Sequence, residues 1–101
     1  IVDDIKNCAT ADFKKAGSSI YLIGRTQDAM AGSEYFRKMG CTSSGVPIVD
    51  LPTLKNSVDF MIGLIAGKKI LSCHDISDGG LAISLCEMAI GGMIGAVVDL
   101  S

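Results

Sequence analysis

The apolar residues of this 101-residue chain follow two different periods, which together predict three strands and three helices. Continuous apolar runs of strand length occupy positions 20–24, 70–73 and 94–100. Apolar residues at helical spacing occupy positions 34–39, 52–66 and 78–90. The predicted order is β-α-α-β-α-β, an α/β (α+β) class in which helices cover a sheet.

Capping residues support the limits of these helices. Ser33 is a candidate N-cap for the first helix, and Gly40 is its candidate terminator. Pro52 or Thr53 opens the second helix and Gly67 ends it. The third helix is apolar on most sides, which predicts that other protein covers it.

The composition excludes several classes of protein. Hydrophobic residues make up 49% of the chain and charged residues 20%, which rules out a disordered segment. The net charge of −2 offers no basic face for nucleic acid. This apolar content is high for a free monomer, so we expect another domain or subunit to cover part of the surface. The chain starts without an initiator Met and stops directly after a predicted strand. We therefore expect residues 1–101 to be one partial domain of a longer protein.

The four cysteines show no metal-binding or redox spacing. No Cys-x-x-Cys pair is present, and the single histidine cannot complete a typical zinc site with them. Cys73 and Cys86 lie in apolar runs and are predicted to be core residues. A reducing cytoplasm fits this usage, and no apolar run of about 18 residues or charged-then-apolar leader predicts a membrane span or export.

Residues 73–81, Cys-His-Asp-Ile-Ser-Asp-Gly-Gly-Leu, carry the candidate chemistry. They lead from a predicted strand through a polar turn into a predicted helix. Unpaired N–H groups and the positive end of the helix dipole suit this place for a phosphate. Asp75 and Asp78 would repel a phosphate, and a bridging Mg²⁺ resolves that conflict because it binds carboxylates together with phosphate oxygens.

Each residue of this turn also has a structural interpretation. Asp75 is either a metal ligand or an acceptor for backbone N–H groups within the turn. Ser77 either hydrogen-bonds a phosphate or caps the helix, with Asp78 stabilising the helix dipole. Gly79 and Gly80 permit close backbone approach, either to a ligand or to a neighbouring strand.

His74 is the only histidine of the chain and therefore a tempting general base. The chain offers no nucleophile with suitable spacing and no second histidine. A packed side chain with one satisfied nitrogen explains the residue as well, and we assign no catalytic residue.

Four segments resemble one enzyme superfamily, in the right order along the chain. In chain order they are Gly-Ser-Glu-Tyr at positions 32–35 and Gly-Val-Pro-x-Val-Asp-Leu at 45–51. His-Asp-Ile-Ser-Asp-Gly-Gly-Leu-Ala follows at 74–82 with Glu-Met-Ala at 87–89, and Gly-Ala-Val-Val-Asp-Leu closes the series at 95–100. The superfamily comprises ATP-using enzymes related to aminoimidazole ribonucleotide synthetase. The segments are most similar to the C-terminal domain in the second half of the phosphoribosylformylglycinamidine synthase family.

This resemblance implies a function and a set of site residues. Such enzymes use ATP and Mg²⁺ to convert formylglycinamide ribonucleotide to the amidine in purine biosynthesis, with ammonia from a glutaminase subunit or domain. Their second half holds a nucleotide, ATP or ADP, that is not turned over. Carried onto this chain, the resemblance makes Asp75 a metal ligand. It also places Ser77 at the nucleotide phosphates. Gly79 and Gly80 are further candidates for phosphate binding because they permit close backbone approach.

The resemblance also implies partners. They are the chain's own N-terminal domain, the other half of the parent enzyme, a glutaminase subunit or domain, and possible further copies of the chain. The charge and the apolar runs described above leave no nucleic acid or membrane among the expected partners. The piece alone is expected to be inactive. Two departures are present: Arg25 stands where relatives are often acidic, and the remainder of the usual domain does not follow residue 101.

Two rival interpretations stay open. The chain can belong to a sibling enzyme of the aminoimidazole ribonucleotide synthetase, selenophosphate synthetase or thiamine-phosphate kinase type. It can also be mainly a structural or interface domain.

Overall fold

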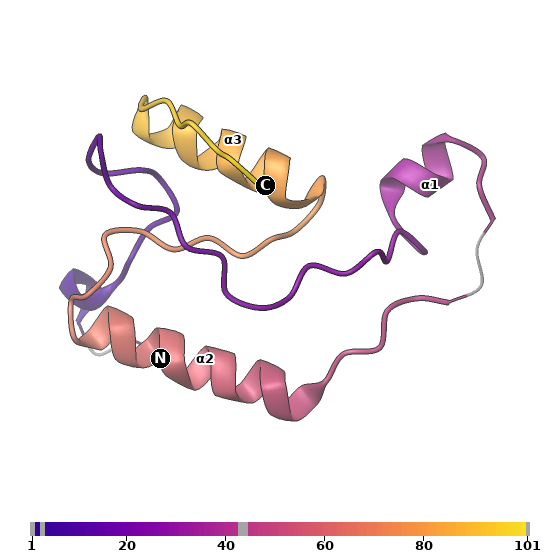
Figure 1. Cartoon of the computed structure of the whole chain (residues 1–101). Coiled ribbons are helices and arrows are strands. Elements are labelled where there is room, and N and C mark those ends of the chain that lie inside the picture. The colour runs from indigo at the N-terminus through magenta and orange to yellow at the C-terminus, as the bar shows by residue number, and fades with distance from the viewer. Residues whose placement is uncertain (1, 3, 43–44, 101) are drawn as a thin grey trace.

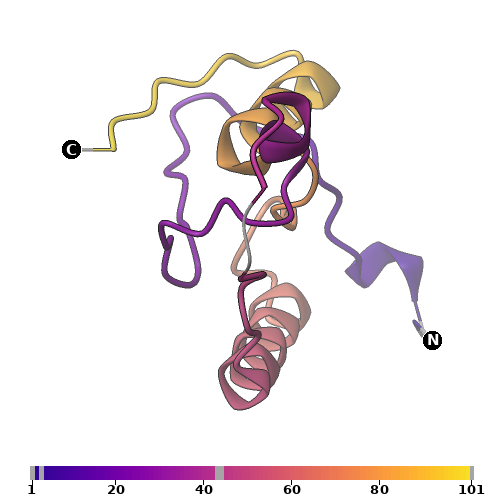
Figure 2. The same cartoon turned by 90° about the vertical axis from the view of Figure 1, so that its right-hand side faces the viewer.

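The computed structural model describes residues 2, 4–42 and 45–100. These residues form a short 3-10 helix, η1 (Ile5–Asn7), and three α-helices, α1 (Glu34–Lys38), α2 (Leu51–Ala66) and α3 (Gly80–Gly92). Figure 1 shows α3 above α2, with long irregular segments between the helices and α1 standing to one side. The turned view in Figure 2 keeps α3 above α2, so the two longest helices occupy separate levels of the molecule.

The predicted sheet is wrong for the residues that the structure describes. They contain no strand, and one isolated parallel bridge joins Thr10 to Ser72. The N–H of Cys73 donates to the carbonyl of Thr10 at 3.2 Å beside this bridge. A strand is stable only when a neighbouring strand takes up its backbone hydrogen bonds. The apolar runs at 20–24 and 94–100 have no such neighbour and remain irregular.

The helices do not close over a hydrophobic core. No hydrophobic side chain among the described residues is buried, and Ser84 is the buried residue of this part of the chain. The accessible surface is 8608 Å², whereas a compact chain of this mass exposes about 5,400 Å². The radius of gyration is 15.7 Å, against about 13 Å for a compact domain of this length. A large apolar surface is therefore open to contact with other protein.

The limits of α1 confirm the predicted caps. The Ser33 hydroxyl accepts a hydrogen bond from the N–H of Phe36 at 3.3 Å. Gly40 adopts a φ of +67°, and the N–H of Cys41 donates back to the Phe36 carbonyl at 2.9 Å. This pattern is the Schellman motif, in which a left-handed residue closes the helix.

The helix α2 begins one residue earlier than predicted. Asp50 is its N-cap, accepting from the N–H of Thr53 at 3.4 Å and from the Thr53 hydroxyl at 2.6 Å. The sequence already carried this signal, because Asp is among the preferred N-cap residues. The predicted end at Gly67 is confirmed, since Gly67 is the C-cap.

Lys68, rather than Gly67, takes the left-handed conformation after α2, with a φ of 52°. Its N–H donates to Ile65 at 3.0 Å and that of Lys69 donates to Leu64 at 2.9 Å. A side chain in this conformation costs about 1 kcal/mol relative to glycine.

We expect Lys68→Gly to slow hydrogen exchange in the last turn of α2 about fivefold. Lys69→Gly should give no gain, because Lys69 has an ordinary φ. Faster exchange in the Lys68 variant would contradict this account.

Asp12 anchors the segment that lies against α3. Hydrogen bonds from the Lys14 ammonium and then from the Thr10 hydroxyl lower the pKa of Asp12 from 3.8 to about 2. The pKa of Asp12 is lower in the folded chain than in the unfolded chain, so the ionised carboxylate stabilises the fold at any pH above the pKa of the unfolded chain. This stabilisation is lost as the pH falls from about 4 to about 2. An NMR titration of the Asp12 carboxyl carbon should give a midpoint near the lowered value, rising toward 3.8 in Lys14→Ala. The neighbouring Lys15→Ala should leave it unchanged, and a wild-type midpoint near 3.8 would refute the prediction.

Candidate functional site

The polar turn of residues 74–79 joins the Thr10–Ser72 bridge to α3. The helix begins at Gly80, two residues later than predicted, with Gly79 as N-cap and no side chain capping it. The prediction that Ser77 caps the helix with its side chain is therefore wrong; its carbonyl accepts from the N–H of Gly80 at 3.1 Å. Since the first turn of a helix has no internal acceptors, this end of α3 is left with N–H groups directed out of the helix. The local chemistry suits an anion.

The two glycines of the turn are both left-handed, with φ of 88° for Gly79 and 70° for Gly80. A Cβ at Gly79 would lie 2.4 Å from Cγ1 of Ile83, one turn further along the helix. A Cβ at Gly80 would meet nothing within 4 Å. The close neighbour of Gly79 is therefore the Ile83 side chain of the same helix, which is neither the ligand nor the strand that was predicted.

His74 lies between two carboxylates. Its Nε2 is 3.0 Å from Oε2 of Glu87 on α3, and its Nδ1 is 3.3 Å from Oδ1 of Asp75. The His74 side chain is 16% exposed, that of Glu87 54% and that of Asp75 88%. The expectation of one satisfied nitrogen is corrected, because both ring nitrogens face an acidic group. One signal for Glu87 was present in the sequence, because this residue is a rare charged position on an otherwise apolar helix.

Ser84 fixes the turn to the helix. It is 3% exposed, and its hydroxyl donates to the backbone carbonyl of Asp75 at 3.4 Å. This bond orients the start of the turn over α3. Ser77 and Asp78 are exposed beyond it, so the structure gathers His74, Asp75 and Glu87 but does not bring the Ser77 side chain into that cluster.

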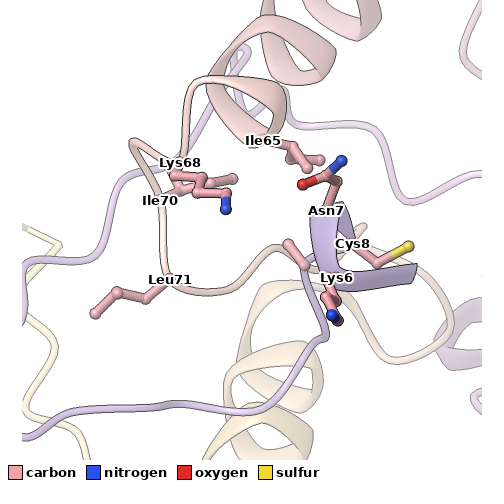
Figure 3. Close-up of a pocket in the computed structure, with 8 residues that line it drawn as sticks. Lys6, Asn7, Cys8, Ile65, Lys68, Ile70 and Leu71 are labelled. Carbon is pink, nitrogen blue, oxygen red and sulfur yellow. The ribbon is translucent and has the colours of Figure 1, made fainter. Parts of the chain in front are cut away.

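Two cavities flank the helices. One of about 70 Å³ has an apolar lining from residues 20–22 and from α3, with His74 at its edge. The larger, of about 190 Å³, lies between η1, the end of α2 and residues 70–71 (Figure 3). Lys6 and Lys68 line it, and no residue of the polar turn does. The candidate phosphate site is the surface at the start of α3. It lies outside the larger cavity, whereas Ile76 of the turn and Leu81 of the first helical turn line the smaller one.

A Mg²⁺ ion bound through Asp75 is compatible with this surface. The described residues contain no group of three or more His, Cys, Asp or Glu that could hold a metal alone. Mg²⁺ does not require such a cage, because it usually combines one or two carboxylates with phosphate oxygens and water. Asp75 is exposed enough to meet a nucleotide-bound ion.

The cysteines show no disulfide. All four are free; Cys73 is half-buried, and Cys8, Cys41 and Cys86 are exposed. The prediction that Cys86 is a core residue is therefore wrong in this structure, because the apolar helix on which it lies is not covered. Among the helices of the described residues, none has the length and apolar character needed to cross a membrane.

Comparison with known proteins identifies the class to which this arrangement belongs. Residues 15–101 match the family described as AIR synthase related protein, C-terminal domain, and the chain belongs to that family. The superfamily resemblance of the four motifs is thereby confirmed.

Curated relatives narrow the resemblance to one enzyme. The chain is 40% identical over 100 residues to the phosphoribosylformylglycinamidine synthase subunit PurL of Azorhizobium caulinodans, covering 98% of the chain and 14% of that protein. It is 42% identical over 101 residues to PurL of Thermoplasma acidophilum, covering 100% of the chain and 13% of the relative. PurL of Thermococcus sibiricus is 41% identical over 96 residues, which cover 95% of the chain and 14% of the relative.

The chain thus spans about one seventh of the length of the curated relatives that it matches. No solved structure matches it. The predicted similarity to phosphoribosylformylglycinamidine synthase is confirmed by these relatives. The assignment to the second half of such an enzyme stays a prediction.

Proposed function

We propose that this chain is part of a phosphoribosylformylglycinamidine synthase, which converts formylglycinamide ribonucleotide to the amidine in purine biosynthesis. The observation that carries the proposal is the match of nearly the whole chain, at about 40% identity, to PurL subunits from distant organisms. The longer protein that contains the chain is called the parent protein below. It is an ATP-dependent ligase that forms a carbon–nitrogen bond, with ammonia derived from glutamine.

Within the parent protein, we assign the start of α3 to a nucleotide. The N–H groups of the first turn and the left-handed Gly79 and Gly80 face the phosphates. Asp75 holds the accompanying Mg²⁺, which neutralises phosphate charge, and the exposed Ser77 hydroxyl donates to a phosphate oxygen. Three features support this assignment. The start of α3 has no side-chain cap, the Asp75 side chain is exposed, and the space beside Gly80 holds no atom within 4 Å of an added Cβ.

Substitution tests the assignment without an activity assay. Asp75→Asn and Ser77→Ala should each lower the amount of ADP that the parent protein retains after gel filtration in Mg²⁺. Lost charge-assisted contacts are expected to weaken nucleotide binding about tenfold or more. Asp28→Asn, an exposed carboxylate far along the chain from the turn, is the matched control. Equal retention in all three variants would remove the turn from the nucleotide site.

The apolar surface supports a second role for the same chain. Twenty-five large hydrophobic side chains of the described residues are exposed, and they include members of every α-helix. Such a surface is stable in water only when other protein covers it. We propose that the rest of the parent protein, with its other half and N-terminal domain, supplies this cover. A glutaminase subunit or domain delivers the ammonia in the cytoplasm, where free cysteines stay reduced.

The experiment that tests the proposed function follows ADP release by the parent protein. It is incubated with ATP, Mg²⁺ and ammonium, with and without formylglycinamide ribonucleotide. Release that requires the ribonucleotide supports the proposal. Release only with an aminoimidazole-pathway, selenide or thiamine-phosphate substrate assigns the chain to a sibling enzyme.

A further inference from the structure

We propose that the Asp78–Gly79 step is a site of spontaneous covalent modification, at which the aspartate isomerises to isoaspartate through a cyclic imide. The reaction takes place within the chain and needs no co-reactant other than water. It goes beyond the proposed function in assigning chemistry to Asp78. It rests on that function only in one respect, because we expect a bound nucleotide to suppress the reaction.

The chemistry uses two groups that adjoin along the chain. The backbone nitrogen of Gly79 attacks Cγ of Asp78, so that a nitrogen–carbon bond forms. The nitrogen gives up its proton and the carboxyl group gives up hydroxide, which together leave as one water molecule. Water then opens the five-membered imide. Opening at Cγ restores aspartate, whereas opening at the original backbone carbonyl leaves the main chain running through Cγ, which is isoaspartate.

The sequence favours this reaction at one position. Asp78 is followed by glycine, and the chain contains no other Asp-Gly step and no Asn-Gly step. Glycine has no side chain to shield its nitrogen, and it adopts positive and negative φ about equally. The peptide group before Gly79 therefore rotates more easily toward the carboxyl carbon than the peptide groups that follow the other aspartates.

The structure leaves this peptide group without an anchor. The carbonyl of Ser77 accepts from the N–H of Gly80 at 3.1 Å, across a turn in which Gly79 has a φ of 88° and a ψ of −5°. These angles belong to a type II turn. The hydrogen bond spans the Asp78–Gly79 peptide, whose own N–H and carbonyl bond to no described residue. The Asp78 carboxylate has no partner in that part of the chain either, and both residues are exposed.

Asp75, three residues earlier in the same turn, is held where Asp78 is not. Its backbone carbonyl accepts from the Ser84 hydroxyl at 3.4 Å, and its Oδ1 lies 3.3 Å from Nδ1 of His74. The nitrogen that follows it belongs to Ile76, whose β-branched side chain is stiff. Side chains of further aspartates accept hydrogen bonds as well, namely those of Asp4, Asp12, Asp50 and Asp59.

Isoaspartate at this position would alter the start of α3. The main chain becomes longer by one carbon atom directly before Gly79, the N-cap of the helix. The bond between Ser77 and Gly80 spans this point, so the turn must widen and the two glycines must shift. A phosphate that accepts from the N–H of Gly79 would instead hold the peptide group still. We therefore expect ADP to suppress the reaction and the isomerised protein to bind ADP less well.

The test follows the parent protein during days of incubation at physiological pH. The peptide that contains Asp78 is analysed by mass spectrometry with electron-based fragmentation, which distinguishes isoaspartate from aspartate. Isoaspartate should accumulate at position 78, after an intermediate that is lighter by one water. Asp78→Glu should stay unmodified, because glutamate would have to close a less reactive six-membered ring.

Asp28 is the matched internal control. It is exposed, but alanine follows it, and the N–H of Ala29 donates to the carbonyl of Gln27 at 2.9 Å. A sample of the parent protein unfolded in urea gives the rate without the fold. Isoaspartate at position 78 in urea but not in the folded protein would overturn the proposal. Equal accumulation at Asp28 and Asp78 would overturn it as well.

ADP separates this proposal from the nucleotide assignment. With ADP at about 100 times its Kd, about 1% of the sites are empty, so isoaspartate should form about 100-fold more slowly than in nucleotide-free protein. Equal rates would support the modification site and remove the nucleotide from this turn. No isoaspartate in a parent protein with ribonucleotide-dependent ADP release would overturn the modification site and leave the proposed function standing.

Discussion

Replacing Gly92 with alanine should loosen α3 more than the same replacement at any other glycine. A Cβ at Gly92 would lie 2.2 Å from the carbonyl oxygen of Phe13 and 2.9 Å from its backbone nitrogen. These are backbone atoms, so no flexible side chain can move aside. The same contact is fixed by a hydrogen bond from the N–H of Phe13 to the carbonyl of Met88 at 3.0 Å. The segment of residues 12–13 must therefore separate from the helix.

The expected cost combines overpacking with the lost hydrogen bond and amounts to about 3 kcal/mol. Hydrogen–deuterium exchange in residues 80–92 of the parent protein should accelerate more than 100-fold. Gly63→Ala is the control, because a Cβ at Gly63, in the last turn of α2, meets nothing within 4 Å. Alanine there should stabilise the helix by about 0.5–1 kcal/mol. Unchanged exchange in Gly92→Ala would show that residues 12–13 do not lie against α3.

Gly79→Ala should be the second most damaging change, acting at the opposite end of the same helix. Alanine at a φ of 88° is strained, and its Cβ would also lie 2.4 Å and 2.7 Å from two atoms of Ile83. The left-handed strain costs about 1 kcal/mol and the collision about 1–3 kcal/mol more. The start of α3 would then unwind. We expect faster exchange in the first turn and weaker retention of ADP.

Gly80→Ala separates these two causes. Its φ of 70° imposes the same backbone strain, but its Cβ would enter open space. The structure therefore predicts about 1 kcal/mol for Gly80→Ala, clearly less than for its neighbour. Equal effects at the two glycines would mean that the contact with Ile83 does not limit the turn. A larger effect of Gly80→Ala on ADP than on exchange would place the ligand beside that residue.

Local signals in the sequence predicted the helices well. Ser33 caps α1 and Gly67 ends α2 as expected, because capping depends on a few adjacent residues. The predicted ends of α3 were less accurate than those of α1 and α2. Two successive left-handed glycines delay its start to Gly80, and it continues through Gly91 and Gly92, two residues beyond the predicted end at residue 90. Glycine lowers the stability of a helix only modestly. Residues 12 and 13, which lie against Met88, Gly91 and Gly92, support the two extra residues of α3.

The sheet was not predictable from the same kind of signal. An apolar run such as residues 20–24 shows only that a segment prefers burial, whereas a strand also needs a neighbour for its backbone hydrogen bonds. That neighbour is a property of the whole arrangement. Within the described residues, the pairing is limited to the contact of Thr10 with Ser72.

The candidate site likewise has features that the sequence predicted and features that depend on the folded arrangement. The polar turn of residues 74–79 was identified from its residue types and their order, and the Asp75 side chain lies exposed at the surface. The pairing of His74 with Glu87 was not foreseen, because it joins residues thirteen positions apart through the geometry of α3. The solvent exposure of Ser77 could not be predicted either, since it follows from the late start of the helix.

The most direct test of the central claim follows one nitrogen atom. The parent protein is incubated with ATP, Mg²⁺, formylglycinamide ribonucleotide and ¹⁵N-ammonium, and the ribonucleotide is analysed by mass spectrometry. We expect a product in which one ¹⁵N nitrogen replaces the amide oxygen, with one ADP formed for each molecule of product. A ribonucleotide that stays unlabelled while the protein consumes ATP with another substrate would contradict the account.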